Sequence, residues 1–168
     1  MDESAFRAFY ESTRHGLWAY ILKVTGEKDV TDDLFQEAYV RLLQSSAGGL
    51  TDIQRKAYLY RIATNLITDH WRKLKRERKW FQPEPREAEV NNEARDVELQ
   101  HDLSDALQHL APQQRSMVWL AYVEEYSHRE IAEMLKLREK SVKVLLFRAK
   151  QKLLEIFEHK GITSEVVS

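Results

Sequence analysis

Apolar residues recur along most of this chain at intervals of three and four positions, the spacing that places them on one face of an α-helix. Earlier series predict a helix that Gly26 ends and a second helix over about residues 31–43. The clearest series lies within residues 53–75, at Leu59, Ile62, Ala63, Leu66, Ile67 and Leu74. No strand-like alternation of apolar and polar residues is visible, so the pattern predicts an all-α fold.

Helical patterns resume after residue 97. One covers "LQHDLSDALQHL" and is ended by Pro112, and the next covers "QQRSMVWLAYVEE". Ser127 and Glu130 then have the spacing of a capping box, which begins a short helix. A tight turn follows, and a last helix is expected over about residues 139–154. The chain should therefore end in a pair of short helices joined by a turn, with Val142, Leu145 and Leu146 buried in the second of them.

A segment between the two helical parts has the composition of a linker. "FQPEPREAEVNNEARD" contains two prolines, few apolar residues and an excess of acids. We therefore expect two small helical domains joined by a flexible acidic linker. The predicted boundaries are residues 1–80 and 99–160 for the domains, 81–98 for the linker and 161–168 for the tail.

The charges are segregated along the chain, although the net charge is only −1. Nine Lys and Arg residues stand against two acids between Arg55 and Lys79, and seven acids against two arginines between Glu84 and Asp102. The near-neutral total argues against a protein that coats nucleic acid unaided. The separated blocks indicate two surfaces with different partners.

Several classes of protein are disfavoured by composition and motifs. The chain has no cysteine, which excludes disulfides and thiolate metal sites. Its six histidines form no metal-binding motif, and neither a nucleophile elbow nor a phosphate-binding loop is present. We expect no enzyme activity, no catalytic residue, no metal and no cofactor. The beginning of the chain lacks a signal-peptide pattern and no stretch has the length of a membrane span, so a cytoplasmic protein without membrane insertion is expected.

The last helix carries a face that a packed core does not require. Opposite its apolar stripe stand Lys140, Lys143, Val144, Phe147 and Arg148. In a DNA major groove, cations can contact phosphates and guanine edges, while Val and Phe can contact thymine methyl groups. The same spacing also fits an ordinary helical hairpin with a solvated basic face. Spacing alone does not separate these interpretations.

Three motifs in order resemble the sigma-70 family of bacterial RNA polymerase sigma factors. "DVTDDLFQEAYVRLL" is similar to the helix with which the family binds core polymerase, and "AYLYRIATNLITDHWRK" to the helix that engages the −10 promoter element. The region from "LQHDLSDALQHLAP" through the helix pair is similar to the domain that binds the −35 element. Two domains without other folded parts point to the extracytoplasmic-function (ECF) group.

The resemblance implies a function and a set of site residues. Core polymerase, promoter DNA and an anti-sigma factor are the expected partners, and initiation with promoter opening is the expected function. The "SSAGGLTDIQ" segment resembles the loop that holds a flipped base in this family. The expected polymerase contacts are Asp33, Leu34, Gln36, Glu37 and Tyr39. The expected −10 contacts are Arg61, Asn65, Thr68 and Arg72, which share one helix face, and the −35 contacts are the five residues opposite the stripe of the last helix.

The helix pair departs from the family pattern at four positions. Lys136 replaces a glycine usual in the turn, and Arg138 replaces a serine usual before the last helix. Val144 and Leu145 occupy positions where Ser and Arg are common. We expect weaker or altered −35 binding, since a cap and one phosphate contact are lost.

Two other functions are compatible with part of the sequence. An autonomous helix-turn-helix regulator would explain the helix pair but not the two earlier motifs. A sigma-like adaptor that binds only protein would fit the loss of readout at Val144 and Leu145.

Overall fold

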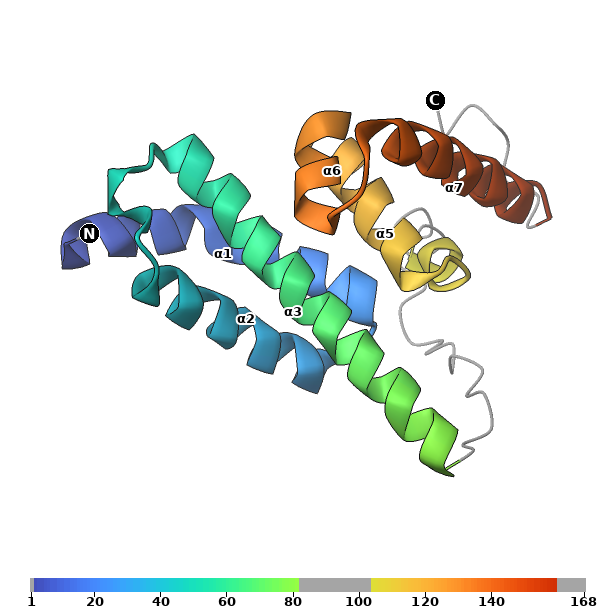
Figure 1. The fold of residues 1–168 in the computed structure, drawn as a ribbon, viewed down its shortest axis with the longest axis horizontal. Coiled ribbons are helices and arrows are strands. Elements are labelled where there is room, and N and C mark those ends of the chain that lie inside the picture. Colours follow the sequence, from blue (N-terminus) through green and yellow to red (C-terminus); the bar gives the residue numbers. More distant parts are fainter. Residues whose placement is uncertain (1, 82–103, 160–168) are drawn as a thin grey trace, which may run out of the picture. The chain divides into compact units, whose positions relative to one another are not determined.

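The computed structural model describes residues 2–81 and 104–159, which are helical apart from short connections and include no strand. The chain divides into two compact units, Met1–Arg72 and Lys73–Ser168, each taken separately below (Figure 1). This confirms the prediction of an all-α fold with two helical parts. Most of the predicted acidic linker and the tail lie outside the described residues.

The first helix, α1 (Glu3–Thr25), has a defined cap at each end. The Asp2 carboxylate accepts a hydrogen bond from the Ala5 N–H at 2.7 Å, which satisfies one of the free donors of the first turn. At the other end Gly26 takes the left-handed conformation, with φ of 74°, and its N–H bonds to Leu22 O. Gly26 therefore ends the helix as its position in the sequence predicted.

The next two helices are longer than their apolar series. α2 covers Lys28–Gln44 and α3 covers Asp52–Phe81, with a 3₁₀ turn, η1 (Ala47–Gly49), between them. Lys, Arg and Glu have high helix propensity, so charged residues extend α3 beyond its last buried position. Apolar periodicity marks the packed part of a helix and leaves its solvated end undefined.

Hydroxyl pairs join these helices within a mostly apolar core. The Thr64 hydroxyl donates to Tyr60 O at 2.7 Å, so the 2.7 Å contact between Tyr20 Oη and Thr64 Oγ1 has Tyr20 as its donor. Tyr20 and Tyr60 are fully buried, and their ring centroids lie 5.4 Å apart. Figure 1 shows α1, α2 and α3 side by side as three long helices. The tyrosine contacts fix α3 against α1.

The second unit is built from shorter helices. A helical segment at 104–108 precedes α5 (Pro112–Val118), a π-helical turn η2 (Trp119–Val123), α6 (His128–Leu135) and α7 (Glu139–His159). Pro112 is the first residue of α5, a position where its missing N–H costs nothing. The helix predicted over 113–125 is confirmed as far as Val123, but its second half is π-helical, since the Glu124 N–H bonds five residues back to Trp119 O at 3.1 Å.

A buried arginine connects the first segment of this unit to α5. Arg115 Nε donates to Leu110 O at 3.0 Å, and its Nη2 donates to Gln108 O at 3.2 Å. Burial lowers the pKa of the Arg115 guanidinium. Arg115, on α5, thus donates hydrogen bonds to carbonyl groups at the end of the preceding helical segment.

Candidate protein and nucleic-acid interfaces

One side of α2 combines exposed polar and exposed apolar residues. Asp33, Gln36 and Glu37 are exposed, and Leu34 is half-buried. Val40 and Leu43 are 45% and 56% exposed, although both belong to the apolar series of the sequence. They follow Gln36 at i+4 and i+7, so the three side chains form one row. Two large apolar groups open to solvent in such a row fit a surface that another protein covers.

Tyr39 does not belong to that row. Only 5% of it is exposed, and its ring packs against Tyr10 and Phe35 at centroid distances of 5.0 and 5.1 Å. Its hydroxyl lies 2.7 Å from Thr13 Oγ1. Such a side chain stabilises the contact between α1 and α2 and is closed to a partner. We therefore assign Tyr39 to the core, and Val40 and Leu43 take its place on the exposed surface.

The −10 residues predicted on α3 lie on a shared, solvent-accessible side. Arg61 and Arg72 are exposed, while Asn65 and Thr68 are half-buried. The Thr68 hydroxyl donates to Thr64 O at 2.9 Å, so it can offer a ligand only its lone pairs. Arg72 Nη1 lies 3.9 Å from Asp69 Oδ1, and both side chains are largely exposed. An exposed pair this long contributes little, so Arg72 can exchange it for a phosphate.

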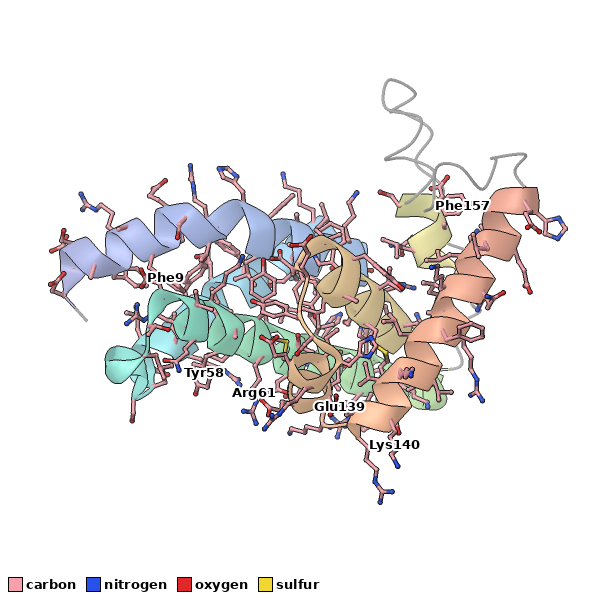
Figure 2. All side chains as sticks on the ribbon, turned by 90° about the horizontal axis from the view of Figure 1, so that it is seen from above. Phe9, Tyr58, Arg61, Glu139, Lys140 and Phe157 are labelled. Atoms are coloured by element: carbon pink, nitrogen blue, oxygen red, sulfur yellow. The ribbon has the colours of Figure 1, made fainter. Side chains whose placement is uncertain are left out.

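Tyr58 is a residue of this side that the sequence did not single out. It is half-buried, and Figure 2 shows it near Arg61 on the same side of α3. Its position three residues before Arg61 was the available signal, since i and i+3 are neighbours on a helix. Trp71 is half-buried, and its ring centroid lies 6.0 Å from that of the adjacent His70. The side chain of Trp80 lies outside the described residues.

The helix pair of the second unit begins with the predicted capping box. Ser127 Oγ accepts from the Glu130 N–H, and Glu130 Oε1 accepts from the Ser127 N–H, each at 3.1 Å. α6 ends at Lys136, which takes the left-handed conformation with φ of 57° and ψ of 45°. Glycine adopts this conformation without strain, whereas a residue with a Cβ does not. Arg138 immediately precedes α7, and its side chain has no acceptor with which to cap the helix.

α7 separates its two faces as the sequence predicted. All five residues of the basic face (Lys140, Lys143, Val144, Phe147 and Arg148) are exposed. Phe147 is 62% exposed. The opposite face buries Val142, Leu146, Ala149, Leu153 and Phe157. Figure 2 shows Lys140 at the beginning of this helix and Phe157 near its other end.

Leu145 does not lie fully in the buried stripe. It is half-buried at the edge between the two faces. The prediction of a buried Leu145 was therefore wrong in degree. A helix buries only about a third of its circumference, and Leu145 lies three residues from Val142 but beyond the packed arc.

Other kinds of site receive no support from the described residues. Across 2–81 and 104–159, no cluster of three or more His, Asp or Glu side chains is arranged to hold a metal ion. No helix in this part of the chain is both long and apolar enough to cross a bilayer.

Comparison with known proteins decides the family. The family profile for sigma-70 region 2 matches residues 9–77, and that for sigma-70 region 4 matches residues 100–153. The RNA polymerase sigma-E factor of Streptomyces avermitilis is 33% identical over 135 residues, covering 80% of this chain and 75% of the relative. The chain belongs to the sigma-70 family of RNA polymerase sigma factors.

Further relatives place this sigma factor in the ECF group. The ECF RNA polymerase sigma factor SigM of Bacillus subtilis is 25% identical over 164 residues, covering 93% of this chain and 96% of its own. The fold is similar to that of the sigma factor RpoE of Bartonella quintana, solved with the anti-sigma factor NepR, with a TM-score of 0.70 and 20% identity. That match covers 92% of this chain and 97% of the other. The α2 and α3 surfaces lie within the region 2 match, and the exposed face of α7 within the region 4 match.

Proposed function

We propose that this ECF sigma factor docks on core RNA polymerase through α2, binds the opened −10 strand along α3 and inserts α7 into the major groove of the −35 element. The observation that carries the proposal is the exposure of an apolar or basic row on each of these three helices. Each row has the chemistry of its proposed partner. The enzyme would provide most of the affinity for DNA, which suits a chain of net charge −1.

On α2 the proposed contacts are Asp33, Leu34, Gln36 and Glu37, with Val40 and Leu43 added. Apolar side chains surrounded by polar ones match the usual anatomy of a protein interface. Glu37 already pairs with Arg41, with 2.9 Å between Glu37 Oε1 and Arg41 Nε. Because both side chains are about half exposed, this pair can rearrange at small cost when a partner binds.

On α3 the proposed division of work follows side-chain chemistry. Arg61 and Arg72 hold the phosphate backbone, while the Asn65 amide and the Thr68 oxygen read base edges. On α7, Lys143 and Arg148 contact phosphates or guanine edges, Lys140 contacts a phosphate, and Val144 and Phe147 contact thymine methyl groups. The protein would act in the cytoplasm, where polymerase and chromosome meet. An anti-sigma factor that binds the free protein is a further proposed partner.

Transcription with purified core polymerase tests the proposal. A library of promoter sequences is transcribed with core enzyme alone and with core enzyme plus this chain. We expect transcripts only with the chain present, and selection of a −10 and a −35 sequence. Duplex binding by the chain alone, without polymerase-dependent transcripts, would favour an autonomous regulator. Polymerase binding without any sequence selection would favour an adaptor.

A further inference from the structure

The turn between α6 and α7 carries two cations that the proposed contacts do not use. Lys136 and Arg138 are exposed, and they flank Leu137, which is half-buried. The Lys136 N–H bonds to Ala132 O, and the Leu137 N–H donates to the same oxygen at 2.9 Å. These hydrogen bonds fix the backbone of residues 136–138, here named the basic turn. Its two charged side chains therefore start from fixed points on either side of the leucine.

Arg138 lies at the N-cap of α7, where its charge opposes that of the helix end. Its carbonyl accepts the first hydrogen bonds of α7, from the Ser141 N–H at 3.0 Å and the Val142 N–H at 3.1 Å. The beginning of a helix carries a partial positive charge, so a cation is unfavourable there. A side chain with an acceptor oxygen would cap the free N–H groups, and arginine has none. Serine or aspartate at this position would stabilise α7 more than Arg138 does.

Lys136 is also unfavourable in the free protein. It takes the left-handed conformation, with φ of 57°, which costs free energy for a residue with a Cβ. Across residues 2–81 and 104–159, no acidic side chain pairs with Lys136 or Arg138. With Lys140, residues 136–140 hold three cations and one acid, Glu139. Two unpaired cations at positions that do not favour them point to an anionic partner outside the chain.

The neighbours of the basic turn indicate which anion it meets. Lys140 and Lys143 of the basic face follow it on α7, and Figure 2 shows Lys140 at the beginning of that helix. In a helix-turn-helix bound to DNA, the second helix lies in the major groove and the first crosses the sugar-phosphate backbone. The turn between the two helices therefore lies over phosphates at the edge of the groove. Cations that contact phosphates add affinity that does not depend on sequence.

We infer that Lys136 and Arg138 bind phosphates of the DNA strand at the edge of the −35 element. The inference rests on the proposed function, because it requires α7 to occupy the major groove there. The basic turn supplies affinity without reading sequence, whereas Val144 and Phe147 contact bases. DNA binding offsets the free energy that both turn residues cost in the free protein.

The test measures how holoenzyme, made from the full chain and core polymerase, binds promoter DNA at several salt concentrations. Lys136→Gln and Arg138→Gln each remove one charge and keep a long polar side chain, while Arg138→Lys keeps the charge. Lys28→Gln is the matched control, because Lys28 is an exposed cation at the first position of α2, in the other unit. Each protein is also tested on a promoter truncated before the −35 element. Selection from a library with a randomised −35 element and thermal melting are recorded alongside.

On the complete promoter, Lys136→Gln and Arg138→Gln should each lower the salt slope by roughly 0.9, and the double variant by roughly 1.8, because each phosphate contact releases counterions. Arg138→Lys and Lys28→Gln should keep the wild-type slope. The selected −35 sequence should stay the same, and no melting temperature should fall, since neither turn charge is paired within the described residues. On the truncated promoter, all variants should bind as the wild type does.

Four results would overturn the inference. Both glutamine variants could keep the wild-type slope, or the slope could fall only in variants that also melt earlier, which marks a structural effect. A loss that persists on the truncated promoter would place the turn against an acidic surface of polymerase, and a changed −35 sequence would mean that the turn reads bases. If wild-type holoenzyme binds the complete and truncated promoters equally, α7 does not reach the −35 element, and the proposed function fails together with the inference.

Discussion

The phenol of Tyr39 donates its proton to Thr13 Oγ1 across 2.7 Å, because the Thr13 hydroxyl already donates to Phe9 O at 2.8 Å. Burial raises the pKa of Tyr39 from 10.0 to about 12. The folded state therefore keeps this proton at a pH where the unfolded chain has released it. The stability that the neutral phenol contributes is complete below pH 10 and is lost as the pH rises from 10 to 12.

Tyr39→Phe should lower the free energy of unfolding by about 1 kcal/mol at neutral pH, since one buried hydrogen bond is lost. The variant should also lose less stability between pH 10 and 12 than the wild type. Urea unfolding at several pH values measures both effects, and Tyr122→Phe, at an exposed tyrosine, is the control. Affinity for core polymerase should not change. A marked loss of that affinity would return Tyr39 to the contact surface.

Val40→Asp and Leu43→Asp test the proposed polymerase surface on α2. Each places a charge in a surface that must be desolvated on binding, so affinity for core polymerase should fall about tenfold or more. The melting temperature should change little, because both positions are exposed. Ala8→Asp adds the same charge at an exposed position of α1 and should bind normally. If all three variants bind core polymerase equally well, α2 is not the surface that contacts it.

Asn65→Ala and Arg72→Ala separate base readout from backbone contact on α3. Asn65→Ala should change base preference within the −10 element, because the amide offers both a donor and an acceptor to a base edge. Arg72→Ala should weaken binding to all sequences alike and reduce the salt dependence, because a phosphate contact carries no sequence information. Selection from a randomised −10 library at two salt concentrations measures both. If this row of α3 is only a solvated face, Asn65→Ala should select the same −10 sequences as the wild type.

Arg148→Ala and Leu145→Ala test the two roles within α7. Arg148→Ala should reduce −35-dependent transcription and lower the salt slope by roughly 0.9 if one phosphate contact is lost. Leu145→Ala should cost less than the 2–5 kcal/mol or so of a fully buried leucine, because Leu145 is half-buried. Arg7→Ala removes an exposed arginine from the other unit and is the control for transcription. If Arg148→Ala transcribes normally, α7 contributes to the core of the second unit and does not contact the −35 element through Arg148.

Lys136→Gly should stabilise the second unit by about 1 kcal/mol, because Lys136 has φ of 57° and glycine tolerates that conformation. Lys136→Ala removes the same charge but keeps a Cβ, so the difference between the two variants isolates backbone strain from charge. Thermal melting provides the comparison. Equal melting temperatures for the two variants would show that the turn carries no strain.

The sequence predicted the fold most reliably where burial repeats along a helix. The packed part of α3, the Gly26 cap and the capping box of Ser127 and Glu130 all follow from local rules of spacing and capping. The two faces of α7 follow from the same periodicity, and all its predicted contact residues are exposed. The expected partners came from the family motifs, because the periodicity of apolar residues does not indicate what a protein binds.

Other features depend on which helices pack together, which no single helix reveals. Val40 and Tyr39 are neighbours in an apolar stretch, yet Tyr39 is buried and Val40 is exposed, because α1 covers only one side of α2. Arg55 and Arg115 are counted in the sequence as cations, but each is buried against backbone carbonyls that its own helix does not supply. Their roles appear only once the connections between helices are folded.

Because α5 is followed by the π-helical turn Trp119–Val123, the direction in which the chain leaves α5 depends on the number of residues in that turn. A π turn accommodates one residue more than an α-helical path, and each residue of an α-helix advances the chain by about 100° around its axis. Deleting one residue within 119–123 would restore regular helix but would rotate the segment that follows by about 100° relative to α5. The segment that follows, with Ser127 and its cap, would keep its own structure. We therefore expect hybrid sigma factors joined on either side of this turn to tolerate substitutions within it far better than the insertion or deletion of a residue.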